Sequence, residues 1–492
     1  MNFNKKGFKF FVTLGLAFIL VLGLAACGNE DDTPADTGSN AGEVTENGSK
    51  EAPPPASSGD LRTDSEGRYI INARAFTDEV PRASYLFMHL HPELAERYVF
   101  DWTIISDQDN AYGLALDPAL EAGGRDMPHI FTAESAFVLR YTQGTMSHFA
   151  MPYSQLIPDL DARINDAGIA PFTVEIGSRN DDVVGLAFQS TGGAMIYRRS
   201  IAESVFGTDD PEEIARITGE NGWDSFLDAA RDLESAGYAA VVGAGDLWQA
   251  IRTTGSPWVV DGELVIDPAR EQMMELHYAL YQENLMIDGG AWQDDWFAAM
   301  GGTGSREVFS FFGPAWLINH VMAGNVGDTY GDWAVAVPPA GFFWGGTWSI
   351  VNAATPTELH GVLGSFLEWL TLDSTPGGFQ YLFANGIFEL AEYEAGLRDS
   401  YGITKDVVAS SVVMDIADGE VGILGGQDMF ATFAPAASYA TGAALTQYDI
   451  DINNWFLDQS ELYATGQKSR EDAIRDFKQM VQDSTQIRVN FD

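Results

Sequence analysis

Apolar positions along the chain alternate between two spacings, one typical of strands and one typical of helices. Strand-length apolar runs and helically spaced stretches follow one another in the order 69–76, 98–106, 112–122, 127–131 and 135–143. The second of these runs leads directly into a short acidic segment that contains Asp107 and Asp109. Strands and helices that alternate in this way predict α/β units with a largely parallel sheet.

Two helices further along the chain have more detailed signatures. Trp223 opens an apolar stripe of helical period, which predicts a helix that packs one face on the core. Near the end of the chain, Ser469 is followed three residues later by Asp472 and then by a second apolar stripe. This spacing resembles a capping box and predicts that a terminal helix begins at Ser469.

The segment 331–352 has the sharpest change of pattern. The apolar run at residues 333–337 predicts a strand buried on both faces, and the two prolines after it end that strand, because proline has no N–H to donate. A glycine-containing loop with the aromatic residues 342–344 follows, and a second apolar run at 348–351 leaves it. Such a loop fits either a surface that contacts a flat apolar ligand or a core turn with buried rings.

The N-terminal part follows neither pattern. Three lysines precede the apolar stretch 10–24, which is short for a membrane span, and small residues lead to Cys27. This arrangement resembles the lipobox of bacterial lipoproteins, so residues 1–27 are predicted to be a signal peptide that ends at a lipidated Cys27. The alternative is an ordinary secretory signal. Residues 28–60 are rich in small and polar residues and predict a disordered tether.

Size and charge narrow the class of protein. The part that follows the tether has about 430 residues, too many for one ordinary core, which predicts two lobes or domains. The formal net charge is −44, and removal of the three lysines of the predicted signal makes it −47. A body of this charge repels nucleic acid and anionic lipid headgroups, so neither is expected as a partner. Cys27 is the only cysteine, which excludes an intramolecular disulfide.

Motifs of catalysis and of metal binding are absent or weak. The sequence has no Gly-x-Ser-x-Gly elbow, no phosphate-binding Gly-x-x-x-x-Gly-Lys loop and no His-Glu-x-x-His. His89 and His91 lack a third partner, and the spacing of Asp449, Asp451 and Asn453 begins a calcium loop without its glycine or its distal glutamate. We therefore expect neither an enzyme nor a bound cofactor or metal ion.

The tryptophans are more informative, because eight of them lie between residues 248 and 348. Sugars present flat C–H faces and a rim of hydroxyls, so a sugar site combines aromatic rings with acidic and amide side chains. The segment 292–296 has this alternation, although tryptophans four residues apart on a helix could equally form a core stripe. On chemistry alone, the candidate ligand-binding residues are Asp107, Asp109, Trp248, Trp292 and Trp296.

Three segments together resemble a known family. Residues 309–316, 331–339 and 345–356 follow the order found in bacterial extracellular solute-binding proteins of family 1, which are similar to the maltose-binding protein and serve ABC importers of sugars. The first segment ends with Gly313 and a tryptophan close behind it, the second runs into prolines, and the third contains a glycine turn and a strand. The resemblance covers roughly residues 65–490.

This resemblance implies an α/β fold of two lobes, the periplasmic-binding-protein-like fold of type II, with a ligand cleft between lobes that strand crossovers join. The crossovers are expected near 180–185 and 335–338. The implied lobe 1 consists of residues 61–183 and 336–395, and the implied lobe 2 consists of 184–335 and 396–492. The ligand-binding residues that the resemblance adds are Glu134, Phe137, Tyr197 (or its neighbour Met195), Trp316, Gly346 and Trp348.

The function that the resemblance implies is capture of an oligosaccharide or a related polar solute. The protein is expected to be a monomer, lipid-anchored on the outer face of the cell membrane, that delivers its ligand to ABC permease subunits. A secreted glycoside hydrolase and a surface solute sensor remain alternatives. Release of reducing sugar from a polysaccharide would indicate the hydrolase.

Overall fold

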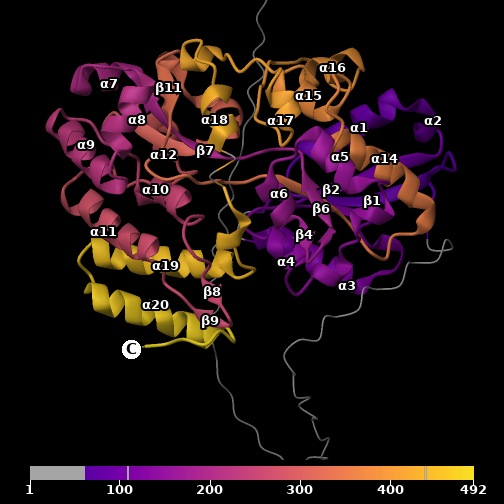
Figure 1. The fold of residues 1–492 in the computed structure, drawn as a ribbon, viewed down its shortest axis with the longest axis horizontal. Coiled ribbons are helices and arrows are strands. Elements are labelled where there is room, and N and C mark those ends of the chain that lie inside the picture. Colours follow the sequence, from indigo (N-terminus) through magenta and orange to yellow (C-terminus); the bar gives the residue numbers. More distant parts are fainter. Residues whose placement is uncertain (1–60, 108–109, 437, 439, 492) are drawn as a thin grey trace, which may run out of the picture. The chain divides into compact units, whose positions relative to one another are not determined.

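The computed structural model describes residues 61–107, 110–436, 438 and 440–491. The predicted signal peptide with Cys27, the predicted tether at 28–60 and the candidate Asp109 lie outside the described residues. Among the helices of the described part, none is long and apolar enough to cross a membrane. Two sheets, each with its own covering helices, make up this part of the chain (Figure 1).

The first sheet has five strands in the order β2-β1-β3-β12-β6. β1 is parallel to both β2 and β3, whereas β12 is antiparallel to β3 and to β6. We call the part of the protein around this sheet lobe 1. Its strands are β1 (Tyr69–Ala75), β2 (Tyr98–Ile104), β3 (Ile130–Glu134), β6 (Gly185–Ala187) and β12 (Thr347–Val351).

The second sheet has three strands in the order β10-β7-β11, and both of its pairings are antiparallel. We call the part around this sheet lobe 2. Its strands are β7 (Gly193–Arg198), β10 (Ser310–Pro314) and β11 (Trp333–Ala336). The prediction of a largely parallel sheet is therefore wrong. The chain leaves lobe 1 after β6 and returns to it in β12, and a strand that returns from the other lobe runs against the one that left.

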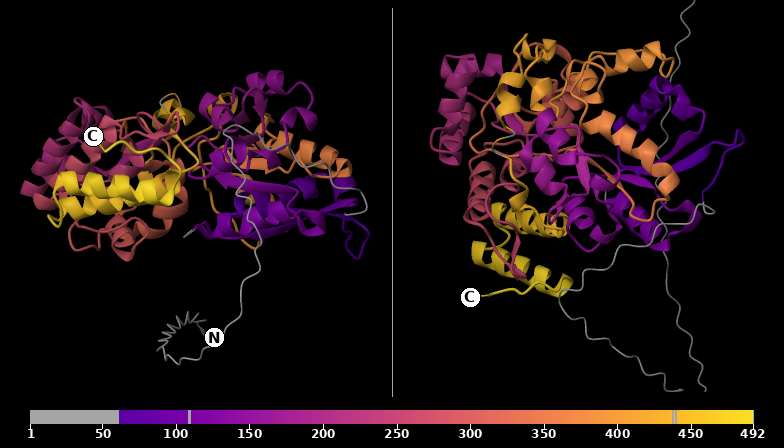
Figure 2. Two further views of the ribbon diagram at one scale, coloured as in Figure 1. Left: turned by 90° about the horizontal axis from the view of Figure 1, so that it is seen from below. Right: turned by 45° about the vertical axis from the view of Figure 1, so that its right-hand side comes forward.

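Helices cover both sheets, as the two further views show (Figure 2). The helices associated with lobe 1 are α1 (Glu79–Leu90), α2 (Pro92–Ala95), α3 (Ala111–Ala122), α4 (Val138–Thr142), α5 (Leu160–Ala167), α6 (Pro171–Ile176), α14 (His360–Thr371), α15 (Phe379–Ala384), α16 (Phe388–Glu394) and α17 (Ser411–Met414). Those associated with lobe 2 are α7 (Arg199–Phe206), α8 (Pro211–Gly219), α9 (Trp223–Ser235), α10 (Ala244–Ile251), α11 (Pro268–Gln282), α12 (Asp294–Met300), α13 (Ala323–Asn325), α18 (Phe430–Ala436), α19 (Asp449–Ala464) and α20 (Arg470–Ser484). Two short hairpins, β4 (Ser178–Arg179) with β5 (Asp182–Val183) and β8 (Val259–Val260) with β9 (Glu263–Leu264), complete the regular elements.

Most of the predicted elements agree with the observed ones. Trp223 is the first residue of α9 and is buried, as its stripe predicts. The hydroxyl of Ser469 accepts a hydrogen bond of 3.1 Å from the N–H of Asp472, which confirms the predicted cap of α20. The predicted strand at 127–131 begins later, at Ile130, because Pro128 has no N–H and His129 bonds Asn72 from the loop instead.

The two lobes are joined where the chain passes between the sheets. It passes from β6 to β7 through residues 188–192, just after the range 180–185 expected for the first crossover, and from β11 to β12 through 337–346. A third segment runs beside the first passage, since Ala409 donates to the carbonyl of Phe188 at 2.9 Å and Ser190 donates to that of Val407 at 3.2 Å. The boundaries of the four predicted lobe segments stay a prediction. The predicted lobe 2 begins at residue 184, whereas β6 (Gly185–Ala187) still belongs to the sheet of lobe 1.

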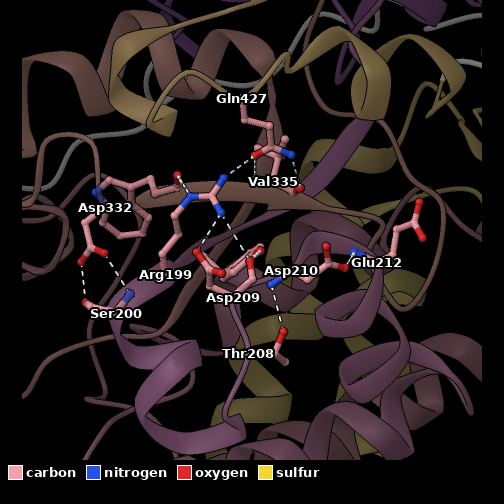
Figure 3. A network of polar contacts seen from close by, with 11 residues as sticks. Arg199, Ser200, Thr208, Asp209, Asp210, Glu212, Asp332, Val335 and Gln427 are labelled. Atoms are coloured by element: carbon pink, nitrogen blue, oxygen red, sulfur yellow. Dashed lines mark hydrogen bonds and ion pairs between the residues drawn. The ribbon is translucent and has the colours of Figure 1, made fainter.

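A polar network fixes β11, the edge strand from which the second passage starts (Figure 3). The side-chain amide of Gln427 accepts from the N–H of Val335 and donates to its carbonyl, both at 2.9 Å. Arg199 donates to the carbonyl of Trp333 at 3.1 Å, and Asp332 accepts from the N–H of Ser200 at 2.9 Å. The amide of Gln427 thus takes the place of a neighbouring strand at the edge of the sheet.

Replacement of Gln427 by alanine is expected to lower the free energy of unfolding by about 1–3 kcal/mol, because it removes both hydrogen bonds from buried Val335. Urea unfolding would measure the loss. Gln427→Glu keeps one acceptor oxygen but removes the donor, so we expect it to destabilise the protein as well. Unchanged midpoints for both variants would contradict the role given to the amide.

Candidate functional site

A cavity of about 620 Å³ lies between the lobes. Lobe 1 lines it with residues that follow the ends of three strands, namely Phe76 after β1, Asp107 after β2 and Ala136 after β3. Parallel strands end at the same edge of a sheet, and in open α/β sheets ligands bind outside the carboxyl ends of the strands. Lobe 2 contributes residues of α10, of the loop before α12 and of the π-helical turn η6 (Leu317–Met322), and both passages between the lobes contribute residues as well.

Three tryptophans form one wall of the cavity. The rings of Trp292 and Trp316 are nearly parallel, with an interplanar angle of 9° and centroids 6.3 Å apart. Trp344 packs edge-on against Trp316, with centroids 4.8 Å apart. Trp292 is 48% exposed, although large apolar side chains are normally buried. The wall therefore offers a flat apolar surface to a ligand.

The backbone around this wall is locally strained. Trp292 has a φ of +67°, a conformation that costs free energy for a bulky side chain and that is found mostly at functional sites. The turn beside the wall contains Gly345 and Gly346, both with positive φ. A Cβ on Gly345 would lie 3.1 Å from Nε1 of Trp316, so a glycine there allows the ring to sit against the turn. Nε1 of Trp316 donates to the carbonyl of Trp344 at 3.1 Å, which fixes the plane of the ring.

A buried carboxylate supports the wall from below. The indole N–H of Trp296, which packs 5.3 Å from Trp292, donates to Asp246 at 2.9 Å. The other oxygen of Asp246 accepts from the N–H groups of Val242 and Gly243, both at 3.2 Å. Burial raises the pKa of Asp246 to about 6, although these hydrogen bonds act in the opposite direction.

Glu134 stands at the end of β3 and faces the same cavity. Its carboxylate accepts from the hydroxyl of Ser135 and from the N–H of Ala136, both at 2.6 Å. Burial raises the pKa of Glu134, and the nearby charges of Arg252 and Asp107 act on it in opposite directions. Burial lowers the pKa of Arg252. Nε of Arg252 has no hydrogen-bond partner in the described part of the chain.

A histidine and an aspartate meet near the passages between the lobes. Nε2 of His320 lies 3.7 Å from the carboxylate of buried Asp406, to which Gln189 also donates at 3.5 Å. Burial lowers the pKa of His320, but the nearby carboxylate of Asp406 raises it, and the net direction is upward. His320 and Gln189 both line the cavity, so the polar contacts of the passages extend into the site.

A second cavity of about 460 Å³ shares Asp107 and Ala136 with the first. Its other walls come from α3, from Phe137 and from the start of α19. The lining of this second cavity is more polar than that of the first and includes Asn110, Asp451 and Asn454. The two cavities give the site an aromatic end and an acidic and amide end.

The structure brings five of the candidate ligand-binding residues together at the first cavity and places a sixth, Phe137, at the second. The five are Asp107, Glu134, Trp292, Trp316 and Gly346. Ligand contact by these six residues stays a prediction.

Four other candidates are buried in the core and line neither of the two cavities. Trp248 stacks on Phe456, and Trp296 lies beneath Trp292. Tyr197 is fully buried in β7 and donates to the carbonyl of Asp209 at 2.7 Å. Trp348 is fully buried too, and its indole donates to the carbonyl of Thr173 at 2.8 Å. In the loop 342–344, Phe342 and Phe343 are buried, as the core-turn interpretation predicts. Trp344 lines the cavity, and its contact with a ligand stays a prediction.

Sequence reasoning missed several residues that line the cavity, among them Glu79, Gln249 and Arg252. Glu79 opens α1 directly after β1, so its position after a strand end was a usable signal. Gln249 and Arg252 lie in and just after α10, on a helix of ordinary amphipathic pattern, and nothing in that pattern separates them from a solvated face.

Comparison with known proteins places the fold. No family model matches the sequence, and no curated protein sequence matches it either. Among solved structures, an extracellular solute-binding protein of family 1 is similar at a TM-score of 0.62 and 17% identity, covering 84% of this chain and 99% of that one. The galacto-N-biose-/lacto-N-biose I-binding protein of an ABC transporter from Bifidobacterium longum, solved with lacto-N-biose, is similar at 0.62 and 14%, covering 87% and 100%. An ABC substrate-binding protein from Listeria monocytogenes, solved with cycloalternan, is similar at 0.58 and 11%, covering 84% and 98%.

Proposed function

The chain has the two-lobed α/β fold of the extracellular solute-binding proteins, and from this we propose that it is a binding protein that captures a carbohydrate or a related polar solute in the cleft between its lobes. The observation that carries the proposal is a cavity lined both by the wall of Trp292, Trp316 and Trp344 and by polar side chains of lobe 1. Flat C–H faces of a sugar fit the wall, and its hydroxyls fit the polar side. The cavity of about 620 Å³ has the size of a small-molecule site.

Binding would act through closure of the lobes. Lining residues come from both lobes and from the passages that join them, so a ligand that contacts all of them favours the closed arrangement over the open one. A permease that recognises the closed arrangement would then accept only the loaded protein. We propose delivery to an ABC permease on this basis, and because the similar structures include binding proteins of ABC transporters.

The location of the protein is also a proposal. The lipobox-like residues that end at Cys27 support a lipid anchor on the outer face of the cell membrane, with residues 28–60 as a spacer. A binding protein held there would meet extracellular solute. Labelling with a radioactive fatty acid, lost in a Cys27→Ala variant, would test the anchor.

Isothermal titration of the mature protein against a panel of mono- and oligosaccharides tests the proposed function. We expect stoichiometric binding without turnover for at least one carbohydrate. Trp316→Ala should weaken that binding by about 1–3 kcal/mol, because the ring lines the cavity and aromatic stacking has this magnitude. Tyr330→Ala is the matched control, since this aromatic ring is 62% exposed and does not line the cavity. Absence of binding to every sugar would overturn the proposal, and release of reducing sugar from a polysaccharide would indicate a glycoside hydrolase instead.

A further inference from the structure

The charges that line the cleft do not balance. Three carboxylates face it, those of Glu79, Asp107 and Glu134, and the cationic side chains among the lining residues are Arg252 and His320. His320 is paired with Asp406, which neutralises it when it is protonated. Arg252 also lies in the field of a fourth carboxylate, that of Asp449, so it is shared between two acids. The cleft therefore has an excess of negative charge.

The three carboxylates also lack their own cations. In the part of the chain that the structure describes, no ion pair joins any of them to an arginine, lysine or histidine. One oxygen of Glu79 is buried and accepts no hydrogen bond from a described residue. Burial raises the pKa of Glu134, the charge of Arg252 opposes this shift, and the charge of Asp107 adds to it. Like charges in a partly buried site are costly unless a cation lies between them.

The aromatic wall of the same cavity suits the same kind of ligand. The face of an indole ring carries a negative quadrupole and attracts a cation placed over it, and tryptophan does so most strongly. Trp292 and Trp316 present nearly parallel rings, and Trp344 stands edge-on beside them. A cationic group bound in this cavity would have both indole rings and carboxylates among the residues that line it.

We propose that the ligand of this cleft carries a positive charge, and that the carbohydrate it selects is an amino sugar or an oligosaccharide that contains one. The proposal rests on the proposed function and makes its substrate class narrower. Glu79 and Asp107 are the residues that set the selectivity, because Glu134 has hydrogen-bond donors of its own and lies near Arg252. A neutral sugar of the same shape would leave the excess of negative charge in the cleft in place.

The experiment compares matched pairs of sugars that differ in one group. The mature protein is titrated at low ionic strength and near neutral pH, where the sugar amine is mostly protonated. The ligands are glucose and glucosamine, galactose and galactosamine, and the β-1,4-linked trimers of glucose and of glucosamine. We expect the amino member of at least one pair to bind about ten-fold tighter or more than its neutral partner. Added salt should reduce this ratio, because it screens the attraction.

Variants then locate the effect. Glu79→Gln and Asp107→Asn should each reduce the preference for the amino member several-fold while they keep most of the affinity for the neutral one. Asp224→Asn removes the same charge from an exposed position of α9 that does not line the cleft, and it should leave the ratio unchanged. This control separates the local field from that of the whole acidic protein. Circular dichroism and melting temperature establish that each variant is folded.

The outcomes separate the two proposals. Equal or tighter binding of the neutral members would overturn the inference and leave the proposed function standing. A preference for amino sugars that Asp224→Asn reduces as much as Glu79→Gln would also overturn it, since the selectivity would then come from net charge. If no neutral or amino sugar binds, the proposed function fails and the inference fails with it.

Discussion

Truncation of Trp296 to alanine is expected to lower the free energy of unfolding by about 3–5 kcal/mol, the range typical of a large aromatic side chain removed from a core. Trp296 is 1% exposed and packs against Phe297 and Phe311. Its loss also leaves buried Asp246 without the indole donor, which adds to the cost. Thermal and urea unfolding would measure the effect.

Trp292, four residues earlier, provides the matched comparison. It is half-exposed on the wall of the cleft, so Trp292→Ala should cost only about 1 kcal/mol of stability from lost ring contacts. Ligand affinity should instead fall by about 1–3 kcal/mol. A variant of Trp296 that stayed as stable as the natural protein and lost affinity would reverse the roles that the structure gives the two rings.

The second large effect is a pH dependence that belongs to Asp246. Its pKa in the folded protein is about 6, above the ordinary value of 3.8, so the folded state holds the proton more tightly than the unfolded state does. Stability is therefore unaffected by this group at pH values below about 4, falls as pH rises through the window between 4 and 6, and stays lower above it. The shift corresponds to a loss on the order of 3 kcal/mol.

A variant series isolates this contribution. Asp246→Asn has no charge to bury, so its stability relative to the natural protein should rise between about pH 4 and pH 7, apart from a constant offset for altered hydrogen bonds. His277→Gln should show the opposite trend, so that its stability relative to the natural protein rises as pH falls. Burial lowers the pKa of His277 to about 4, so the natural protein loses stability as pH falls from 6.5, and the glutamine variant does not. A difference between Asp246→Asn and the natural protein that did not vary with pH would contradict the assignment.

Several parts of the fold follow from local pattern. The strand at 69–75, the helix that starts at Trp223 and the cap at Ser469 were predictable because each depends on residues close in sequence. The direction of the strands was not predictable from local pattern. Whether β12 runs with or against β3 depends on where the chain comes from, and no residue of β12 records that it returns from the other lobe.

The candidate site, like the fold, has parts that the sequence predicts and parts that it does not. Asp107 was predicted from the acidic segment after the strand at 98–106, and Glu134 from the resemblance to the solute-binding proteins, but the depth of each tryptophan was not predictable. Trp292 and Trp296 have the same chemistry and helical spacing, yet one is 48% exposed and the other 1%. Trp348 was expected in the cleft wall. In the structure its ring points from β12 into the core of lobe 1, where its indole N–H donates to the carbonyl of Thr173.

The sequence by itself determined the α/β class, the order of the elements, the excess of acid and the stock of aromatic side chains, because these depend on composition and on short-range pattern. Only the tertiary structure decided which of those side chains meet. Lobe 1 and lobe 2 bring Glu79, Glu134, Arg252 and Trp316 to one cavity from positions far apart in the chain. Burial depends on what packs above a residue, and that is set by contacts between distant segments, which local pattern does not encode.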